Sequence, residues 1–261
     1  MTIFSFRALA LLATICIATN CDAQTESSEL SSQFRFGAGL FGSLYFHSAG
    51  FSGLPGVSTC CPYYENGSGL GLGAAAFFQK PLAPAFSLSL WGGASDIVAG
   101  FTSIEEKTVI VDNTVQSATI QHILETNIAA LYFEMQLSAQ FSTLFSGFIG
   151  MRGDFFATSS FRQREELVIP ETGSFETGTR VRNERSGALP GINRGLISPI
   201  LGIRFDVPLN AERTMFLLPE LSFGLSVTDA TGFAPWGVRQ IRAGATFGWQ
   251  FQKDLEFIRE K

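Results

Sequence analysis

Hydrophobic and polar residues alternate strictly along the last strand predicted by the sequence, residues 237–251. Successive side chains of a strand point to opposite sides, so this pattern gives the strand two unlike faces. The apolar face carries Ile241, Ala243, Ala245, Phe247, Trp249 and Phe251; the other carries Gln240, Arg242, Gly244, Thr246, Gly248 and Gln250. A strand that separates lipid from a polar lumen is expected to have this pattern.

Seven further segments show the same alternation and are predicted as strands. They cover about 34–47, 69–80, 85–91, 126–140, 144–157, 196–207 and 214–228, with the third fading at Gly92-Gly93. The total is therefore eight. An even number allows an antiparallel up-and-down sheet to close on itself and leave no unpaired edge.

The predicted links between strands differ in length according to their order. The second, fourth and sixth links are short; the second is a turn at Pro81-Leu82-Ala83-Pro84, where two prolines disfavour a central ladder. The odd links are far longer. The third contains a hairpin (108–111, an Asp112-Asn113 turn, 115–120), which we expect to extend beyond the membrane, and the fifth is a charged loop from Phe161 to Gly195. Short turns on one side and long loops on the other are typical of outer-membrane barrels.

Composition supports a membrane barrel and excludes some partners. The chain has 261 residues, of which 46% are hydrophobic and 16% charged, yet its mature region has no apolar run long enough for a transmembrane helix. A barrel resolves this, since its apolar residues are dispersed at every second position. The net charge of -5 gives a nucleic-acid partner no electrostatic support.

The N-terminal residues 1–23 are predicted to be a signal peptide. Arg7 precedes an apolar stretch from Ala8 to Thr19, and small residues permit cleavage near Ala23. Lipidation of Cys21 is an alternative, disfavoured by the Asn that precedes it. Residues 24–33 are expected to form a disordered leader, residues 34–251 the barrel, and residues 252–261 a charged periplasmic stub.

Alternation alone leaves open which face is inside, and a soluble carrier of the lipocalin kind would turn its apolar face inward. The polar face argues against this, because it is mostly Gly, Ser and Ala with a few charges of both signs. Such charges suit a narrow lumen in which ions are paired: Arg35, Glu134, Arg152, Arg204, Glu220 and Arg242. An aromatic girdle is predicted at the periplasmic rim from Phe34, Phe36, Phe86, Phe141, Phe145, Phe247, Trp249 and Phe251.

Few residues carry a pattern typical of chemistry. Cys60 and Cys61 lie in the first outside loop, where they would form either a ring or pair that stiffens a turn or a redox-sensing or ligand-sensing element. The two histidines, His47 and His122, are interpreted as hydrogen-bonded rim residues. We predict no catalytic residue, metal site or cofactor, since no spacing suggests one.

The third outside loop, Phe161 to Gly195, contains six Arg and five Glu. It is either a run of solvated charge or a folded, ion-paired cap, and the closely matched signs favour the cap. Its arginines would suit contact with anionic lipopolysaccharide.

Several stretches resemble those of a known family. Phe-Ser-Gly-Leu-Pro-Gly-Val (51–57), Cys-Cys-Pro (60–62), Gly-Thr-Arg-Val-Arg-Asn (178–183) and the terminal Gly-Trp-Gln-Phe lie between or within amphipathic strands. With them, the chain resembles outer-membrane β-barrel domains of the Bacteroidota and Chlorobi, which are similar to the OmpA transmembrane domain and to PorT-like barrels. The resemblance implies that Phe251, with Trp249 and Phe247, is a signal to the barrel-assembly machinery. In OmpA-like members a wall-binding domain follows the barrel, whereas in this sequence the stub 252–261 follows it.

The sequence thus predicts an all-β, eight-stranded antiparallel barrel in the outer membrane. The expected function is non-enzymatic: a structural, adhesive or secretion-accessory role, with the lumen plugged by paired charges. Expected partners are membrane lipids, lipopolysaccharide, the assembly machinery and an envelope or secretion protein. The alternatives are a small ligand-permeable pore, including one in which Arg and Glu switch partners, and a soluble lipid carrier.

Overall fold

The structure is a computed structural model, and it describes residues 32–59, 63–111 and 114–253. Within these ranges the regular structure consists of ten strands. They are β1 (Ser32–Phe51), β2 (Tyr64–Ala83), β3 (Phe86–Val111), β4 (Thr114–Ser142), β5 (Phe145–Ile169), β6 (Val181–Ala188), β7 (Gly195–Phe205), β8 (Val207–Pro208), β9 (Met215–Leu225) and β10 (Trp236–Lys253). No helix of the described residues is long and apolar enough to span a bilayer.

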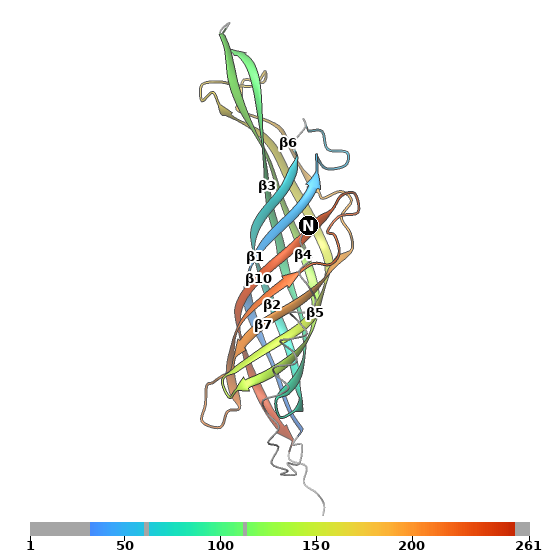
Figure 1. The fold of residues 1–261 in the computed structure, drawn as a ribbon, viewed down its shortest axis with the longest axis vertical. Helices are drawn as coiled ribbons and strands as arrows, with labels where there is room; N and C mark the ends of the chain where they lie inside the picture. The colour runs from blue at the N-terminus through green and yellow to red at the C-terminus, as the bar shows by residue number, and fades with distance from the viewer. Residues whose placement is uncertain (1–31, 60–62, 112–113, 254–261) are drawn as a thin grey trace, which may run out of the picture. The chain divides into compact units, whose positions relative to one another are not determined.

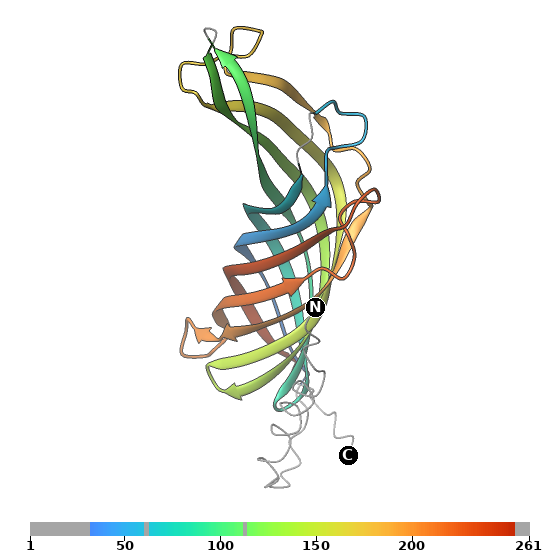
Figure 2. The ribbon, with the colours of Figure 1, turned by 45° about the horizontal axis from the view of Figure 1, so that its top comes forward.

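Eight of these strands form a ring. The sheet order is β10-β1-β2-β3-β4-β5-β7-β9, and β10 also pairs with β9, so the path returns to its start (Figures 1 and 2). Every register recorded between neighbours is antiparallel. The predicted all-β antiparallel barrel fold is therefore confirmed. The two additional strands lie off the ring: β6 pairs with β5, and β8 pairs with β9.

The ring closes unevenly, because its ladders differ greatly in length. The ladder of β3 and β4 runs without interruption from Phe86 opposite Ala139 to Val111 opposite Thr114. The ladder of β7 and β9 extends only from Ile200 to Arg204 on the β7 side. Long strands on one side of the ring therefore continue beyond the short strands on the other.

The expected end of the third strand at Gly92-Gly93 is wrong. β3 continues through both glycines for 26 residues. Beyond them the alternation persists, with Ile97, Ala99 and Phe101 buried. The predicted hairpin is the far part of β3 and β4, and its Asp112-Asn113 turn lies outside the described residues. Glycine weakens a strand but does not end it when the neighbouring ladders continue.

Two predicted links are also shorter than expected. Pro81 is part of β2 and lies opposite Ser87, so only Pro84 and Ala85 separate β2 from β3. The segment from Phe161 to Gly195 is not one loop, because its first part continues β5 and a later part forms β6 against it. Pro81 is tolerated because it lies at the end of its strand, beside a register shift.

The two ends of the barrel differ. At the turn end, β2 connects to β3 and β4 connects to β5 through two residues each. At the opposite, loop end, the β2–β3 ladder stops at Gly67 opposite Phe101, and the strands beyond it form an outer extension. We define the outer extension as residues 102–111, 114–124, 161–169 and 181–188 of β3, β4, β5 and β6; Figure 1 shows it beyond the ring.

The outside of the barrel is apolar. Large apolar side chains on the ring strands are exposed, as Leu40, Leu72, Leu131, Ile149 and Leu201 illustrate. Ring contacts at the turn end connect most of the predicted aromatic girdle and add two further phenylalanines: Phe34, Phe36, Phe78, Phe141, Phe145, Phe205, Phe247, Trp249 and Phe251. The shortest ring strands, β7 and β9, have 11 residues each, enough for a tilted strand to cross a bilayer.

Some predicted features fall outside the described residues. These are the signal peptide 1–23, the leader up to residue 31, Cys60 and Cys61, and residues 254–261 of the stub.

Candidate functional site: the filled lumen

The lumen contains a closed ring of five polar side chains, which we call the ionic ring. Its members are Arg242 from β10, Glu134 and Gln136 from β4, Arg204 from β7 and Glu220 from β9, and all five are buried. Each belongs to the inward-facing set of its strand, so strand periodicity turns all five side chains into the lumen.

Hydrogen bonds connect the five side chains in sequence. Both terminal nitrogens of Arg242 donate to Glu134, at 2.8 and 2.9 Å, and Nη2 also donates to Glu220 at 2.8 Å. Arg204 donates to Glu220 through Nε at 3.1 Å and through Nη2 at 2.5 Å, and Nη2 also reaches Gln136 Oε1 at 2.5 Å. The amide of Gln136 completes the circuit by donating to Glu134.

The ionic ring is neutral and enclosed by aromatic side chains. Two guanidinium groups balance two carboxylates, which limits the cost of burying charge. The guanidinium carbon of Arg204 lies 5.0 Å from the ring centres of both Trp91 and Phe148, and that of Arg242 lies 4.9 Å from Phe41. The arrangement fills this level of the lumen with bonded side chains.

The other two predicted lumen arginines form separate pairs. Arg152 donates to its near neighbour Asp154 at 2.6 Å and to Ser95 at 2.9 Å, and it lies over the ring of Tyr132. Arg35 pairs with Asp206 nearer the turn end. Four of the six predicted charges are thus brought together, and two are not.

Sequence reasoning did not predict that Gln136, Asp154 and Asp206 bond to the lumen charges, although Gln136 and Asp154 have the same strand parity as the predicted residues Glu134 and Arg152. It also missed the inward aromatic residues Phe41, Phe77, Phe148 and Phe216. The signal was available for Phe41 and Phe77, which have the same strand parity as the inward residues Tyr45 and Gln79. The signal was also available for Asp206, which has the same parity as the inward residue Arg204 within the predicted strand 196–207.

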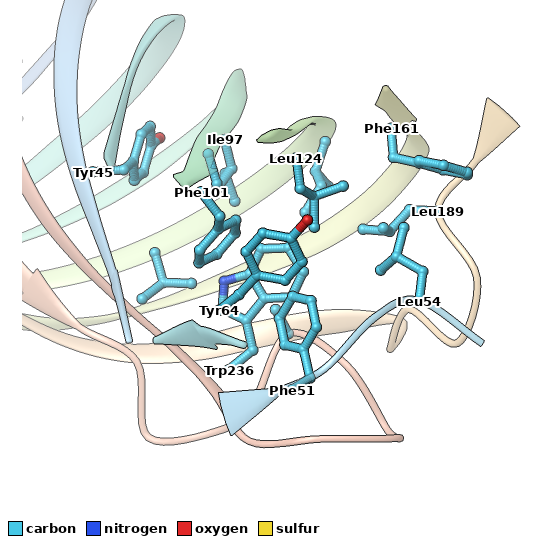
Figure 3. Packing of buried hydrophobic residues seen from close by; sticks show 14 of the residues in the cluster. Tyr45, Phe51, Leu54, Tyr64, Ile97, Phe101, Leu124, Phe161, Leu189 and Trp236 are labelled. Atoms are coloured by element: carbon cyan, nitrogen blue, oxygen red, sulfur yellow. The ribbon is translucent and has the colours of Figure 1, made fainter. Parts of the chain in front are cut away.

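A second obstruction, which we call the outer plug, fills the loop end of the barrel. It is a cluster of buried apolar side chains that the sequence did not predict: Tyr45, Phe51, Leu54, Tyr64, Ile97, Ala99, Phe101, Leu124, Ile128, Ala130, Phe161, Leu189, Leu196, Ala230, Trp236 and Val238. Figure 3 shows the rings of Phe51, Tyr64, Phe101 and Trp236 gathered at its centre. The ring centres of Phe101 and Trp236 are 5.1 Å apart. The barrel is therefore filled at two levels of different chemistry.

Three loops close over the outer plug. The β1–β2 loop contributes Leu54, the link between β6 and β7 contributes Leu189, and the β9–β10 loop contributes Ala230. Backbone hydrogen bonds tie these segments together: Gly50 donates to Pro235, Asn193 to Ala230 and Gly232 to Gly191. We refer to the three loops as the cap.

His47 fastens the centre of the outer plug. The indole N–H of Trp236 donates to His47 Nδ1 at 3.0 Å, and His47 Nε2 lies 2.9 Å from the carbonyl oxygen of Val98. An indole N–H can only donate and a carbonyl can only accept. His47 must therefore be neutral, with its proton on Nε2. The predicted hydrogen-bonded histidine is present, but it is buried.

His122 lies in the outer extension between two carboxylates. Its Nε2 is 3.2 Å from Glu105 and its Nδ1 is 3.7 Å from Glu165, which also accepts from Arg182 and Asn183 at 2.8 Å each. Burial acts to raise the pKa of Glu105, but hydrogen bonds from Lys107 and His122 outweigh it and lower that pKa overall. The cluster ties β3, β4, β5 and β6 together.

The arginines of the 161–195 segment mostly bond to the protein itself. Arg162 pairs with Glu184, Arg164 with Glu125 and Arg182 with Glu165. Arg180 donates to the carbonyl oxygens of Leu167, Val168, Pro170 and Glu171. This segment is a folded, ion-paired structure rather than a run of solvated charge.

Among the described residues, no group of three His, Cys, Asp or Glu side chains could hold a metal ion. The predicted assembly-signal residues Phe247, Trp249 and Phe251 lie on β10 at the turn end. Trp249 and Phe251 are exposed there, while Phe247 is half-buried.

No protein-family model matches the sequence, and the comparison with curated proteins gives no match. Among solved structures, the chain is similar to Ail, the attachment invasion locus protein of Yersinia pestis, with 10% identity, 84% of this chain and 99% of that chain covered, and a TM-score of 0.32. It is also similar to the outer membrane protein OprG of Pseudomonas aeruginosa, with 12% identity, 85% of this chain and 97% of that chain covered, and a TM-score of 0.36. A third similar structure is the outer membrane protease OmpT of Escherichia coli, with 8% identity, 88% of this chain and 99% of that chain covered, and a TM-score of 0.30. Likenesses this distant assign no role to the chain.

Proposed function

We propose that this protein is a non-conducting, non-enzymatic barrel of the bacterial outer membrane that presents its outer extension to a partner. The observation that carries the proposal is the filling of the lumen at two levels, by the ionic ring and by the outer plug. An eight-stranded barrel has little more room than its own side chains need. The apolar outside with its aromatic belt favours a lipid environment over the soluble carrier.

The outer extension is the surface proposed to meet the partner. Its sheet extends beyond the ring, and its fold is fixed by the His122 cluster and by a small core of Ala118, Ile120 and Leu167. A rigid, protruding sheet suits an adhesive, structural or secretion-accessory role. We propose a non-enzymatic role because both histidines are buried and are already engaged by protein groups.

Proposed lipid contacts follow the chemistry of the surface. Acyl chains would cover the apolar outside, and the turn end would face the periplasm, where the assembly machinery would meet the aromatic end of β10. Lipopolysaccharide contact is proposed for Arg185 and Arg194, which are exposed. Arg185 donates to the carbonyl oxygen of the adjacent Glu184 at 3.4 Å, whereas the other four arginines of the segment are held by ion pairs or by several backbone carbonyls.

Conductance in planar bilayers tests the sealed lumen against the alternative of a small pore. We expect full-length protein, shown to be folded by its shifted migration without heating on a detergent gel, to give no steady current at neutral pH. Two narrow obstructions in series leave no continuous water path for ions. A reproducible open channel would overturn the sealed-barrel proposal and favour the pore.

A further inference from the structure

We propose that the bond between His47 and Trp236 is an acid-released latch that holds the cap over the barrel mouth. This inference deepens the proposed function, on which it rests, by giving the sealed barrel a condition under which its loop end opens. Trp236 is fully buried, and its indole N–H bonds to the one ring nitrogen of His47 that carries no proton.

Protonation removes that acceptor. A protonated imidazole has an N–H at both ring nitrogens, so Nδ1 would then face the Trp236 N–H as a second donor. The carbonyl of Val98 would still accept from Nε2. The clash therefore falls on Trp236 alone, and a buried indole N–H without an acceptor is unfavourable.

The surroundings offer the charged imidazole little compensation. Tyr45 of β1, Phe101 of β3 and Trp236 of β10 pack against the ring. Two titratable groups of adjoining segments are engaged elsewhere: Tyr64 of β2 packs against Phe101, and Asp229 of the β9–β10 loop accepts from the backbone N–H of Trp236. Among the described residues no carboxylate pairs with His47, whereas His122 has two.

Release of Trp236 would be transmitted to the cap. The backbone of Trp236 is bonded to Asp229 and Ala230 in the β9–β10 loop. Pro235, beside it, accepts from Gly50 at the end of β1, just before the β1–β2 loop. Withdrawal of the indole from the outer plug therefore loosens two loops together, while the ionic ring below stays closed.

The test is the mobility of a nitroxide on Val57, a partly buried cap residue packed against the outer plug. Full-length protein carrying Val57→Cys, with the four native cysteines Cys16, Cys21, Cys60 and Cys61 each replaced by Ser, is labelled and placed in lipid vesicles. Its spectrum is recorded from pH 7.5 to pH 4. We expect a mobile component to appear at the expense of the immobilised one on acidification and to disappear when the pH is restored. His47→Gln, which cannot titrate, should abolish this response to pH.

Two further variants keep the test decisive. His122→Gln replaces the other histidine of the chain, so the pH response should persist. Trp236→Phe lacks the indole N–H, so the response should disappear. Any of three results would overturn the latch. The spectrum could stay unchanged at pH 4 before either histidine is replaced, the response could be retained in His47→Gln, or it could be lost in His122→Gln. Because the ionic ring still blocks the lumen, current at neutral pH would instead contradict the sealed barrel.

Discussion

At the scale of single residues, hydrogen bonds and ion pairs between buried side chains hold the lumen closed. Glu134 accepts both terminal nitrogens of Arg242 and the amide of Gln136, and Glu220 is shared by Arg204 and Arg242. In a site of low polarity, each member is stabilised only while its partners keep their charge. The ionic ring is therefore sensitive to the loss of a single carboxylate.

Replacing Glu134 with Gln is expected to lower the free energy of unfolding by about 3 kcal/mol, because it leaves one buried guanidinium charge uncompensated. Urea titration of folded protein in lipid vesicles measures this change. Glu184→Gln is the matched control, since Glu184 pairs with Arg162 at an exposed position and should matter by less than about 1 kcal/mol. Equal effects of the two substitutions would contradict the structural importance of the ionic ring.

The sequence predicted which charges face inward but not how they pair. Inward orientation follows from parity along each strand, which is local information. The partners Glu134 and Arg242 lie on β4 and β10, which are not neighbours in the sheet. Their meeting depends on the stagger of the whole barrel, a quantity that a single strand does not contain. For the same reason, Arg35 could not be separated from the ring by its sequence pattern.

At the scale of strands, close backbone approach at glycines shapes the seam between β1 and β10. A Cβ built on Gly39 would lie 2.4 Å from the carbonyl oxygen of Ala245 and 2.6 Å from the Cα of Thr246. Three residues further along β1, Gly42 has open space instead. Backbone atoms cannot yield as a flexible side chain can, so the two glycines differ in function although their sequence context is similar.

Gly39→Ala is expected to destabilise the barrel by roughly 1–3 kcal/mol, because the seam must shift to admit the methyl group. The same change at Gly42 should leave stability nearly unchanged or slightly higher. Unfolding in vesicles and migration of unheated protein on detergent gels measure both variants. A tolerated Gly39→Ala with a damaging Gly42→Ala would contradict the seam geometry.

The alternation of apolar and polar residues predicted which segments form strands, but it did not predict where those strands end. The glycines at 92 and 93 and the proline at 81 are local stop signals, yet β3 and β2 include them, since neighbouring ladders keep the backbone paired. The β6 strand also escaped prediction, because its short polar sequence is stabilised by β5 beside it. Local propensity yields to sheet context at these positions.

At the scale of the whole molecule, two fillings of opposite chemistry lie within one apolar cylinder. The apolar outside was predictable, since it repeats on every strand. The outer plug was not, because it is assembled from ring strands and from three loops whose conformation the sequence leaves open. Both fillings depend on the orientation of the strands. The face of each strand that carries the polar side chains must point into the lumen, and the face that carries the large apolar side chains must point outward.

Oxygen accessibility of nitroxide labels along β4 tests that orientation most directly. Labels are placed singly at Leu131, Phe133 and Leu137, which are exposed, and at Ala130, Tyr132 and Ser138, which are buried. The protein has its four native cysteines, Cys16, Cys21, Cys60 and Cys61, replaced by Ser and is reconstituted in lipid vesicles. High accessibility to oxygen at the first three positions and low accessibility at the other three is the expected result. The reverse pattern, or equal values at all six, would contradict a barrel that faces lipid with this side of its strands.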